Sequence, residues 1–81
     1  MHIFITGGSK GIGRGMVVEF LKRGHSVSFT GTSESSVSKA SSGLKGNFLG
    51  LVCDVRVMKS LEKAKSDAIA KYDLIDIWIN N

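Results

Sequence analysis

The chain has 81 residues, of which 42% are hydrophobic and 22% are charged, and its formal net charge is +4. A chain of this size buries only about 60% of the surface that it exposes when unfolded, so we expect one thin core. No apolar run approaches the ~20 residues that a membrane span requires, and the basic residues are scattered among acidic ones, which argues against membrane and nucleic-acid partners. The first residues do not resemble a signal or transit peptide, so we expect a cytoplasmic protein.

The sequence predicts no metal site. The single cysteine, Cys53, lies in an apolar run and has no cysteine partner, so we expect a buried thiol rather than a disulfide or a metal ligand. His2 and His25 lie at the starts of predicted strands, without a carboxylate or cysteine at ligand spacing, and neither is assigned a role.

The first part of the chain predicts a strand, a helix and a second strand. Residues 2–6, HIFIT, are β-branched and aromatic and run into glycine, which favours a strand buried in a parallel sheet. A helix ending at Gly24 is predicted next, because apolar residues recur three or four apart: Ile12, Met16, Val17, Phe20 and Leu21. Residues 25–31 alternate like a second strand, and the serine-rich residues 32–43 predict a short helix or a loop.

The second part of the chain predicts a strand, a helix and a final strand. Residues 47–55, NFLGLVCDV, favour a strand in which Gly50 marks a close backbone approach. An amphipathic helix of about four turns follows, with apolar residues at Val57, Leu61, Ala64, Ala68 and Tyr72. The apolar run LIDIWIN at 74–80 predicts the last strand. Strands that alternate with helices at this spacing imply right-handed β-α-β units, so the expected fold class is α/β with a parallel sheet.

Five of the ten glycines lie within the stretch ITGGSKGIGRG, where a predicted strand meets a predicted helix. The first turn of a helix leaves backbone N–H groups unpaired and carries partial positive charge, so a phosphate binds there if no side chain blocks it. In such a site Gly7 makes the tight turn, Gly11 lets the phosphate approach, and Gly13 lets the helix pack on the strand. Gly8 and Gly15 have no required role.

The glycine spacing distinguishes the classes of phosphate-binding loop. A P-loop requires G-x-x-x-x-G-K-[ST], and no glycine of the cluster is followed by Gly-Lys at that distance, which argues against a kinase or GTPase. The pattern G-x-G-x-x-G fails as well, because Met16 follows Gly11 and Gly13 where glycine or alanine is required. The pattern present, from Thr6 to Gly13, is T-G-x-x-x-G-I-G.

The stretch TGGSKGIG resembles the cofactor motif of the short-chain dehydrogenases/reductases, and two later motifs agree in order and distance. CDV at 53–55 looks like the acidic end of that family's third strand, and INN at 79–81 looks like the start of its N-N-A-G motif. The resemblance implies a Rossmann-type doubly wound parallel sheet, of which this chain holds the first half, β-α-β-α-β-α-β. It also implies that Asp54 contacts the adenine ring of a nicotinamide cofactor, and that hydride passes between the nicotinamide and a small-molecule carbonyl or alcohol.

The cofactor-binding residues that the resemblance implies lie in the glycine turn and at the ends of the predicted strands: Gly7, Ser9, Lys10, Gly11, Ile12, Gly13, Thr32, Ser33, Asp54, Val55, Asn80 and Asn81. In dinucleotide folds an acidic residue at the end of the second strand binds the ribose 2′-OH and selects NAD. Gly31 occupies that position here, so no carboxylate repels a 2′-phosphate. Lys10 can offer the phosphate a cation, and Thr32 and Ser33 can donate hydroxyl hydrogen bonds, so we expect NADP(H) to be favoured over NAD(H). One departure from the family is that many NADP-using members carry arginine where this chain has Thr32.

The family uses a tyrosine as acid/base, a lysine four residues later and a serine that holds the substrate oxygen. The only tyrosine here, Tyr72, has Asp76 four residues later, so we assign no catalytic residue and expect Tyr72 to pack on the sheet. The chain stops at Asn81, within the N-N-A-G motif. We therefore interpret residues 1–81 as the N-terminal part of one NAD(P)-binding domain of a longer, homo-oligomeric reductase. With an open apolar edge at its last strand, this piece alone is expected to lack turnover and to self-associate.

Two other functions fit the same glycine turn. One is a stand-alone module that binds NADP or another adenine nucleotide without catalysis. The other is an S-adenosylmethionine site, which also follows a first strand but does not require the terminal INN. Ala-Gly beyond Asn81 and a later Tyr-x-x-x-Lys in the coding sequence would support the enzyme, and a stop codon would support the module.

Overall fold

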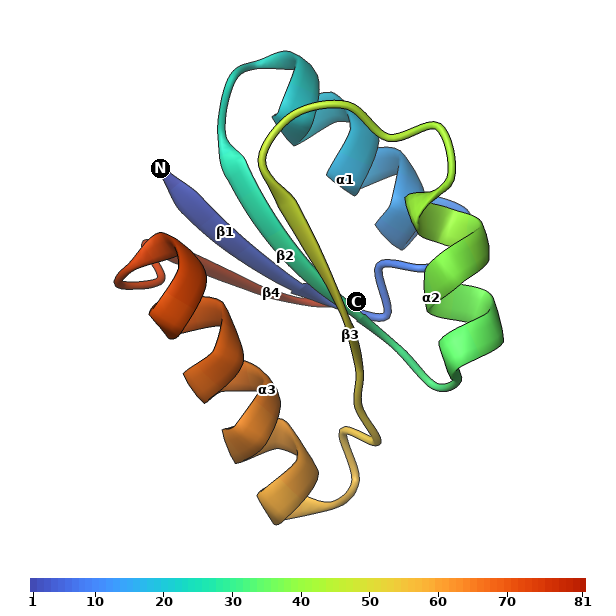
Figure 1. The fold of residues 1–81 in the computed structure, drawn as a ribbon, viewed down its shortest axis with the longest axis vertical. Helices are drawn as coiled ribbons and strands as arrows, with labels where there is room; N and C mark the ends of the chain where they lie inside the picture. The colour runs from blue at the N-terminus through green and yellow to red at the C-terminus, as the bar shows by residue number, and fades with distance from the viewer.

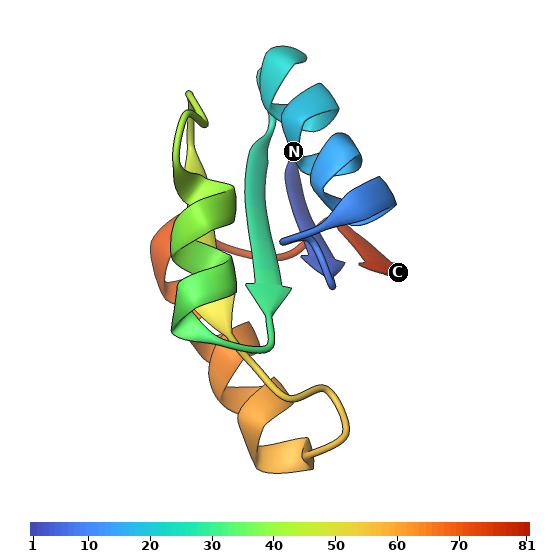
Figure 2. The ribbon, with the colours of Figure 1, turned by 90° about the vertical axis from the view of Figure 1, so that its right-hand side faces the viewer.

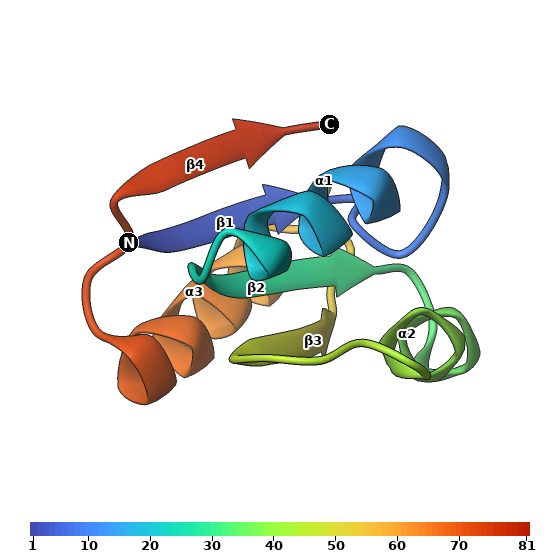
Figure 3. The same ribbon diagram turned by 90° about the horizontal axis from the view of Figure 1, so that it is seen from above.

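The protein is a single parallel sheet of four strands with three helices, and the computed structural model describes residues 1–81. In chain order the elements are β1 (His2–Thr6), α1 (Gly11–Lys22), β2 (Ser26–Gly31), α2 (Glu34–Ser41), β3 (Phe48–Val52), α3 (Met58–Tyr72) and β4 (Ile77–Asn80). The strand order is β3-β2-β1-β4, and every neighbouring pair is parallel (Figure 3). This confirms the predicted first half of a Rossmann-type sheet.

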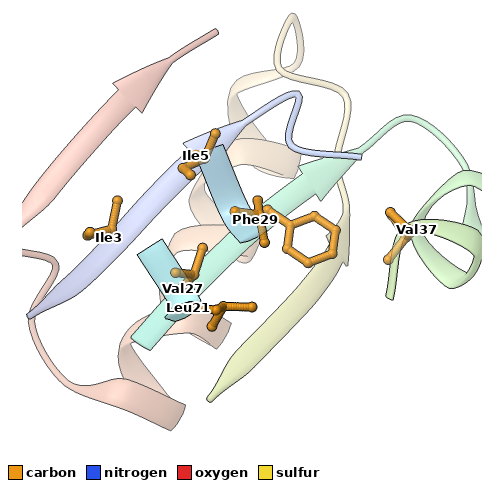
Figure 4. Packing of buried hydrophobic residues seen from close by; sticks show 8 residues of the cluster. Ile3, Ile5, Leu21, Val27, Phe29 and Val37 are labelled. Atoms are coloured by element: carbon orange, nitrogen blue, oxygen red, sulfur yellow. The ribbon is translucent and has the colours of Figure 1, made fainter. Parts of the chain in front are cut away.

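The helices cover both faces of the sheet, with α1 and α2 on one side and α3 on the other (Figure 1). The larger core cluster lies under α1 and α2 and joins side chains of β1 and β2 to both helices (Figure 4): Ile3, Ile5, Val17, Leu21, Val27, Phe29, Val37 and Ala40. A smaller cluster under α3 contains Phe4, Cys53, Ala64 and Ala68. β1 contributes buried residues to both clusters, and all five of its residues are buried, as expected for a strand of a parallel sheet that is covered on both faces.

The serine-rich segment forms a true helix, α2, which begins with a capping box. The hydroxyl of Ser33 accepts a hydrogen bond from the Ser36 backbone N–H at 3.1 Å, and the Ser36 hydroxyl accepts one from the Ser33 N–H at 3.4 Å. These bonds supply acceptors for N–H groups that have none within the helix, and so offset the low helix propensity of serine. Gly24 lies two residues after the end of α1 and has φ +84°, as predicted for a glycine that follows a helix C-terminus.

The main differences from the sequence prediction concern two strand boundaries and one helix face. The third strand ends at Val52 rather than at residue 55, because the chain turns where the Asp54 carbonyl accepts a hydrogen bond from the Val57 N–H at 2.9 Å. The last strand begins at Ile77 rather than at residue 74. Ile12 was expected on the apolar face of α1, yet it is 80% exposed, because the buried stripe of that helix consists of residues 13, 17 and 21, four apart.

The structure has no helix that is both long enough and apolar enough to span a bilayer.

The burial of Ile3 gives a test of the core. Ile3 is 0% exposed and Ile12 is 80% exposed, so the same loss of one methyl group has different consequences at the two sites. Ile3→Val should lower the free energy of unfolding by about 1 kcal/mol, because it leaves a small cavity in the larger cluster. Ile12→Val should leave the free energy of unfolding within about 0.5 kcal/mol of that of the parent protein. Urea unfolding followed by circular dichroism measures both, and equal effects would contradict this assignment of the core.

Candidate functional site

The loop between β1 and α1 is held against the end of β2 by two of its backbone N–H groups. Since all strands are parallel, their carboxyl ends lie along one edge of the sheet, and the loop leaves β1 there (Figure 2). The Gly7 N–H donates to the hydroxyl of Thr30 at 3.1 Å, and the Gly8 N–H donates to the Thr30 carbonyl at 2.9 Å. The Cys53 N–H donates to the Gly31 carbonyl at 2.9 Å, so the end of β3 joins the same edge.

The other side of the loop is held by the end of β4. The Asn81 backbone N–H donates to the Thr6 hydroxyl at 3.2 Å, and its side-chain amide donates to the Gly7 carbonyl at 3.0 Å. The Thr6 hydroxyl donates to the Ile79 carbonyl at 3.4 Å. The structure thus brings Asn81 of the predicted site next to Gly7, 74 residues away in the chain, and places both beside the start of α1.

The N-terminus of α1 is open. The residue before the helix, Lys10, provides no side-chain cap, and the first turn contains no acidic residue. The backbone N–H groups of Gly11, Ile12 and Gly13 have no acceptor in the protein, whereas the Arg14 N–H donates to the Lys10 carbonyl at 3.2 Å. Unpaired N–H groups, the helix dipole and an exposed ammonium group all favour an anion at this position.

The glycines of the loop differ in what a side chain would meet. A Cβ at Gly13 would collide with the Gly7 carbonyl and the Asn81 amide, as expected for a residue that lets α1 pack closely. A Cβ at Gly11 would meet nothing within 4 Å, so the space above the helix start is clear for a ligand. Gly8 was predicted to have no required role, and this was wrong: its Cβ would lie 2.6 Å from the Cβ of Phe29. Gly15 has open space, in line with the prediction.

The end of β2 lies beside the glycine loop. A Cβ at Gly31 would lie 2.9 Å from the Ser9 hydroxyl and 3.0 Å from the Ser36 hydroxyl. Ser9 is therefore next to the position at which related folds carry an acidic residue. Thr32 and Ser33 follow on the surface, both exposed, and the Ser33 hydroxyl is engaged in the capping box of α2.

Asp54, at the end of β3, is held by its own turn. Its carboxylate accepts hydrogen bonds from the Arg56 backbone N–H at 3.0 Å and from the Arg56 guanidinium at 3.0 and 3.1 Å. The side-chain hydrogen bond from Arg56, followed by the backbone hydrogen bond, holds the pKa of the Asp54 carboxyl below its ordinary value. The same pair raises the pKa of Arg56. The Asp54 N–H donates to the Ser60 hydroxyl at 3.0 Å, which joins this turn to α3.

The remaining predicted residues are exposed around the same edge. Ile12 and Val55 are 80% and 50% exposed, so each presents an apolar surface to solvent. Asn80 is exposed as well, but its side-chain oxygen accepts a hydrogen bond from the Trp78 indole N–H at 2.8 Å. Asn80 therefore lies on β4 without contributing to the bonds that hold the glycine loop.

Thr6 and Thr30 are positioning residues that are not among the cofactor-binding residues predicted from the sequence. Both are buried, with 5% and 1% of their surface exposed, and both use their hydroxyls to fix the glycine loop. A signal for them is present in the sequence, because a threonine at the end of a buried strand needs a hydrogen-bond partner for its hydroxyl.

Tyr72 lies at the opposite edge of the sheet. Its hydroxyl donates to the carbonyl of Phe48, the first residue of β3, at 3.0 Å, and its ring contacts His2 edge-on at 5.5 Å. Tyr72 thus packs from the end of α3 onto the starts of the strands, as the sequence predicted.

Comparison with known proteins identifies the family. The model of the short chain dehydrogenase family matches residues 1–81. The chain belongs to the short-chain dehydrogenase family of oxidoreductases. It is 41% identical over 85 residues to the chlorophyll(ide) b reductase NOL of Oryza sativa subsp. japonica, covering 99% of this chain and 25% of the relative. It is 36% identical over 81 residues to the NADPH-dependent pterin aldehyde reductase of Arabidopsis thaliana, covering 98% of this chain and 34% of the relative.

A solved structure agrees with this result. The short chain dehydrogenase of Bacillus anthracis superposes with a TM-score of 0.89 at 35% identity, covering 99% of this chain and 34% of that one. The chain therefore spans between a quarter and about a third of the length of these relatives.

The contacts at Gly13 predict a position-specific effect of alanine in α1. Gly13→Ala should lower the free energy of unfolding by roughly 1–3 kcal/mol, because the new methyl group forces α1 and Asn81 away from the Gly7 carbonyl. The matched control is Gly15→Ala in the same helix, which meets no atom within 4 Å and should raise stability by about 0.5–1 kcal/mol. Urea unfolding measures both, and a destabilising Gly15→Ala together with a neutral Gly13→Ala would contradict the packing described.

The Asp54–Arg56 pair predicts a pH effect. The pKa of Asp54 is lower in the folded protein than in the unfolded chain, so the pair stabilises the folded turn at pH values above the unfolded-state pKa. This stabilisation is lost as the pH falls through the folded-state pKa of Asp54. Arg56→Gln should raise the pKa of Asp54, measured by NMR titration of its carboxyl carbon. Arg23→Gln, which breaks the exposed pair with Glu19, is the control and should leave the Asp54 titration unchanged. An unchanged Asp54 pKa in Arg56→Gln would contradict the assigned cause.

Proposed function

We propose that this chain is the cofactor-binding part of an NADP(H)-dependent reductase that transfers hydride between the nicotinamide and a small-molecule carbonyl or alcohol. The observation that carries the proposal is the open start of α1. Three backbone N–H groups there lack acceptors, no carboxylate lies in the first turn, and the glycine loop beside them is held by Thr30 and Asn81.

The residues around this edge fit a dinucleotide. Gly11, Ile12 and Gly13 would bind the pyrophosphate through their N–H groups, since an anion completes the hydrogen bonding of an uncapped helix. Asp54 and Val55, two strands away, would contact the adenine from the end of β3. Asn80 and Asn81, at the end of β4, would lie toward the nicotinamide half. The bound cofactor would supply the hydride chemistry.

The preference for NADP(H) rests on the end of β2. Gly31 leaves no carboxylate to repel a 2′-phosphate, and any side chain there would collide with Ser9 and Ser36. Lys10 is exposed and makes no ion pair, so its ammonium group is free for a phosphate. Thr32 and Ser33, just after the end of β2, are exposed as well and could donate hydroxyl hydrogen bonds. One relative is named as NADPH-dependent.

The proposal extends to a longer protein, of which residues 1–81 are the N-terminal part of one domain. The relatives are three to four times as long as this chain, as its 25% and 34% coverage of them implies. The acid/base tyrosine and lysine pair would belong to the part beyond residue 81. Homo-oligomerisation of the longer protein and a cytoplasmic location stay predictions. So do the self-association of the 81-residue piece and its lack of turnover.

Cofactor titration tests the proposal. NADPH should bind more tightly than NADH at low salt, and the difference should shrink at moderate salt, because a contact between Lys10 and the 2′-phosphate is screened. Lys10→Gln should weaken NADPH binding by about tenfold and leave NADH binding unchanged, since one charge-assisted hydrogen bond is removed. Nucleotide fluorescence or calorimetry measures these affinities.

Lys65→Gln is the matched control, because Lys65 is an exposed lysine of α3, on the opposite face of the sheet. It should change neither affinity. Equal affinities for NADPH and NADH in the parent protein would contradict the NADP preference. Binding of neither nucleotide would contradict the cofactor site itself.

A further inference from the structure

A groove runs along α1 on the face of the sheet that also carries α2, where the α2–β3 connection passes beside the helix (Figure 1). Its volume is about 540 Å³, and residues of α1 and of the connection line it: Arg14, Val18, Leu21, Lys22, Gly43, Leu44, Lys45 and Gly46. None of these belongs to the proposed cofactor site, so the groove is a separate feature of the molecule.

The groove is positively charged. Three of its eight lining residues are Arg14, Lys22 and Lys45, and none is acidic. Lys22 and Lys45 form no ion pair, and Arg14 uses only its Nε, which donates to the Ala40 carbonyl at 3.3 Å. The remaining guanidinium N–H groups of Arg14 have no acceptor in the protein, although a guanidinium offers five donors in all.

The backbone of the connection adds further donors. Gly43 and Gly46 have φ +83° and +112°, conformations that a side chain would strain. The N–H groups of Gly43, Lys45 and Gly46 have no acceptor in the protein, whereas the Leu44 N–H donates to the Ser41 carbonyl at 3.1 Å. The connection therefore offers unpaired backbone donors next to three cations.

Part of the groove lining is apolar. Val18, Leu21 and Leu44 line it, and Leu21 belongs to the larger core cluster against which Leu44 packs. A lining that combines apolar side chains with cations and free N–H groups matches a ligand that has a hydrocarbon body and an anionic head. Clefts for small molecules span about 300–1,000 Å³, and the volume of the groove falls within that range.

We propose that this groove binds a small amphiphilic anion, an alkyl phosphate or alkyl carboxylate, with its head at Lys22, Lys45 and Arg14 and its chain on Val18, Leu21 and Leu44. The phosphate or carboxylate accepts charge-assisted hydrogen bonds from these side chains and from the backbone of the connection. The alkyl chain covers apolar surface that Val18 and Leu44, both half-buried, otherwise expose to water.

Octyl phosphate, titrated into the protein and followed by NMR chemical shifts or calorimetry, tests the proposal. Binding should perturb residues 14–22 and 43–46, and inorganic phosphate alone should bind at least tenfold more weakly, because it lacks the chain. Lys22→Glu and Lys45→Glu should each weaken octyl phosphate binding by about tenfold, the worth of one charged hydrogen bond. The control Lys65→Glu makes the same charge change on α3 and should leave binding unchanged.

Circular dichroism of each variant checks that it folds, and NADPH affinity is measured in the same samples. NADPH binding that persists while octyl phosphate fails to bind would overturn the groove proposal and leave the proposed function standing. Equal weakening by Lys65→Glu would overturn it as well, since binding would then follow net charge alone. Recruitment to phosphatidylglycerol vesicles without binding of monomeric octyl phosphate would overturn it in favour of a membrane surface.

Discussion

The glycine loop after β1 has almost no side chains of its own with which to hold its shape, and neighbouring strands hold it instead. Thr30 of β2 receives two of its N–H groups, and Asn81 beyond β4 binds the Gly7 carbonyl. These contacts require β1 to lie between β2 and β4, which is the strand order observed. The hydrogen bonds to Thr30 on one side and Asn81 on the other fix the direction in which α1 starts. They therefore also fix the direction in which its free N–H groups point.

Close packing around the loop forces small residues at particular places. Gly8 lies against Phe29, Gly13 against the Gly7 carbonyl, and Gly31 against Ser9. A side chain at any of these positions would push apart the loop, the helix and the sheet. The start of α1 has no capping side chain, and the absence of such a cap lowers the stability of a helix by about 0.5–2 kcal/mol. A bound anion would offset that cost, which explains why an uncapped helix is tolerated where the cofactor is proposed to bind.

The two faces of α1 carry different kinds of interaction. Its inner stripe, Gly13, Val17 and Leu21, packs on the sheet and sets the height of the helix over β1. Its outer side carries Arg14 and Lys22, two of the three cations of the groove shared with the α2–β3 connection. The same helix therefore links the core, the proposed cofactor site at its start and the proposed anion groove along its side.

The sequence by itself determined the order of elements and the family, because apolar periodicity, glycine spacing and the motifs TGGSKGIG, CDV and INN are local patterns. It also indicated Gly13 and Gly50 as points of close approach, and the structure shows side chains or backbone within 3 Å of a Cβ at each. Only the tertiary structure decided the roles of Gly8, Thr6 and Thr30, the exposure of Ile12 and the pairing of Asp54 with Arg56. Most of these features depend on which segments meet across the sheet or between helix and sheet. Thr6 and Asn81, for example, are 75 residues apart in the chain. Local sequence patterns cannot predict contacts between segments so far apart, because the fold alone brings them together.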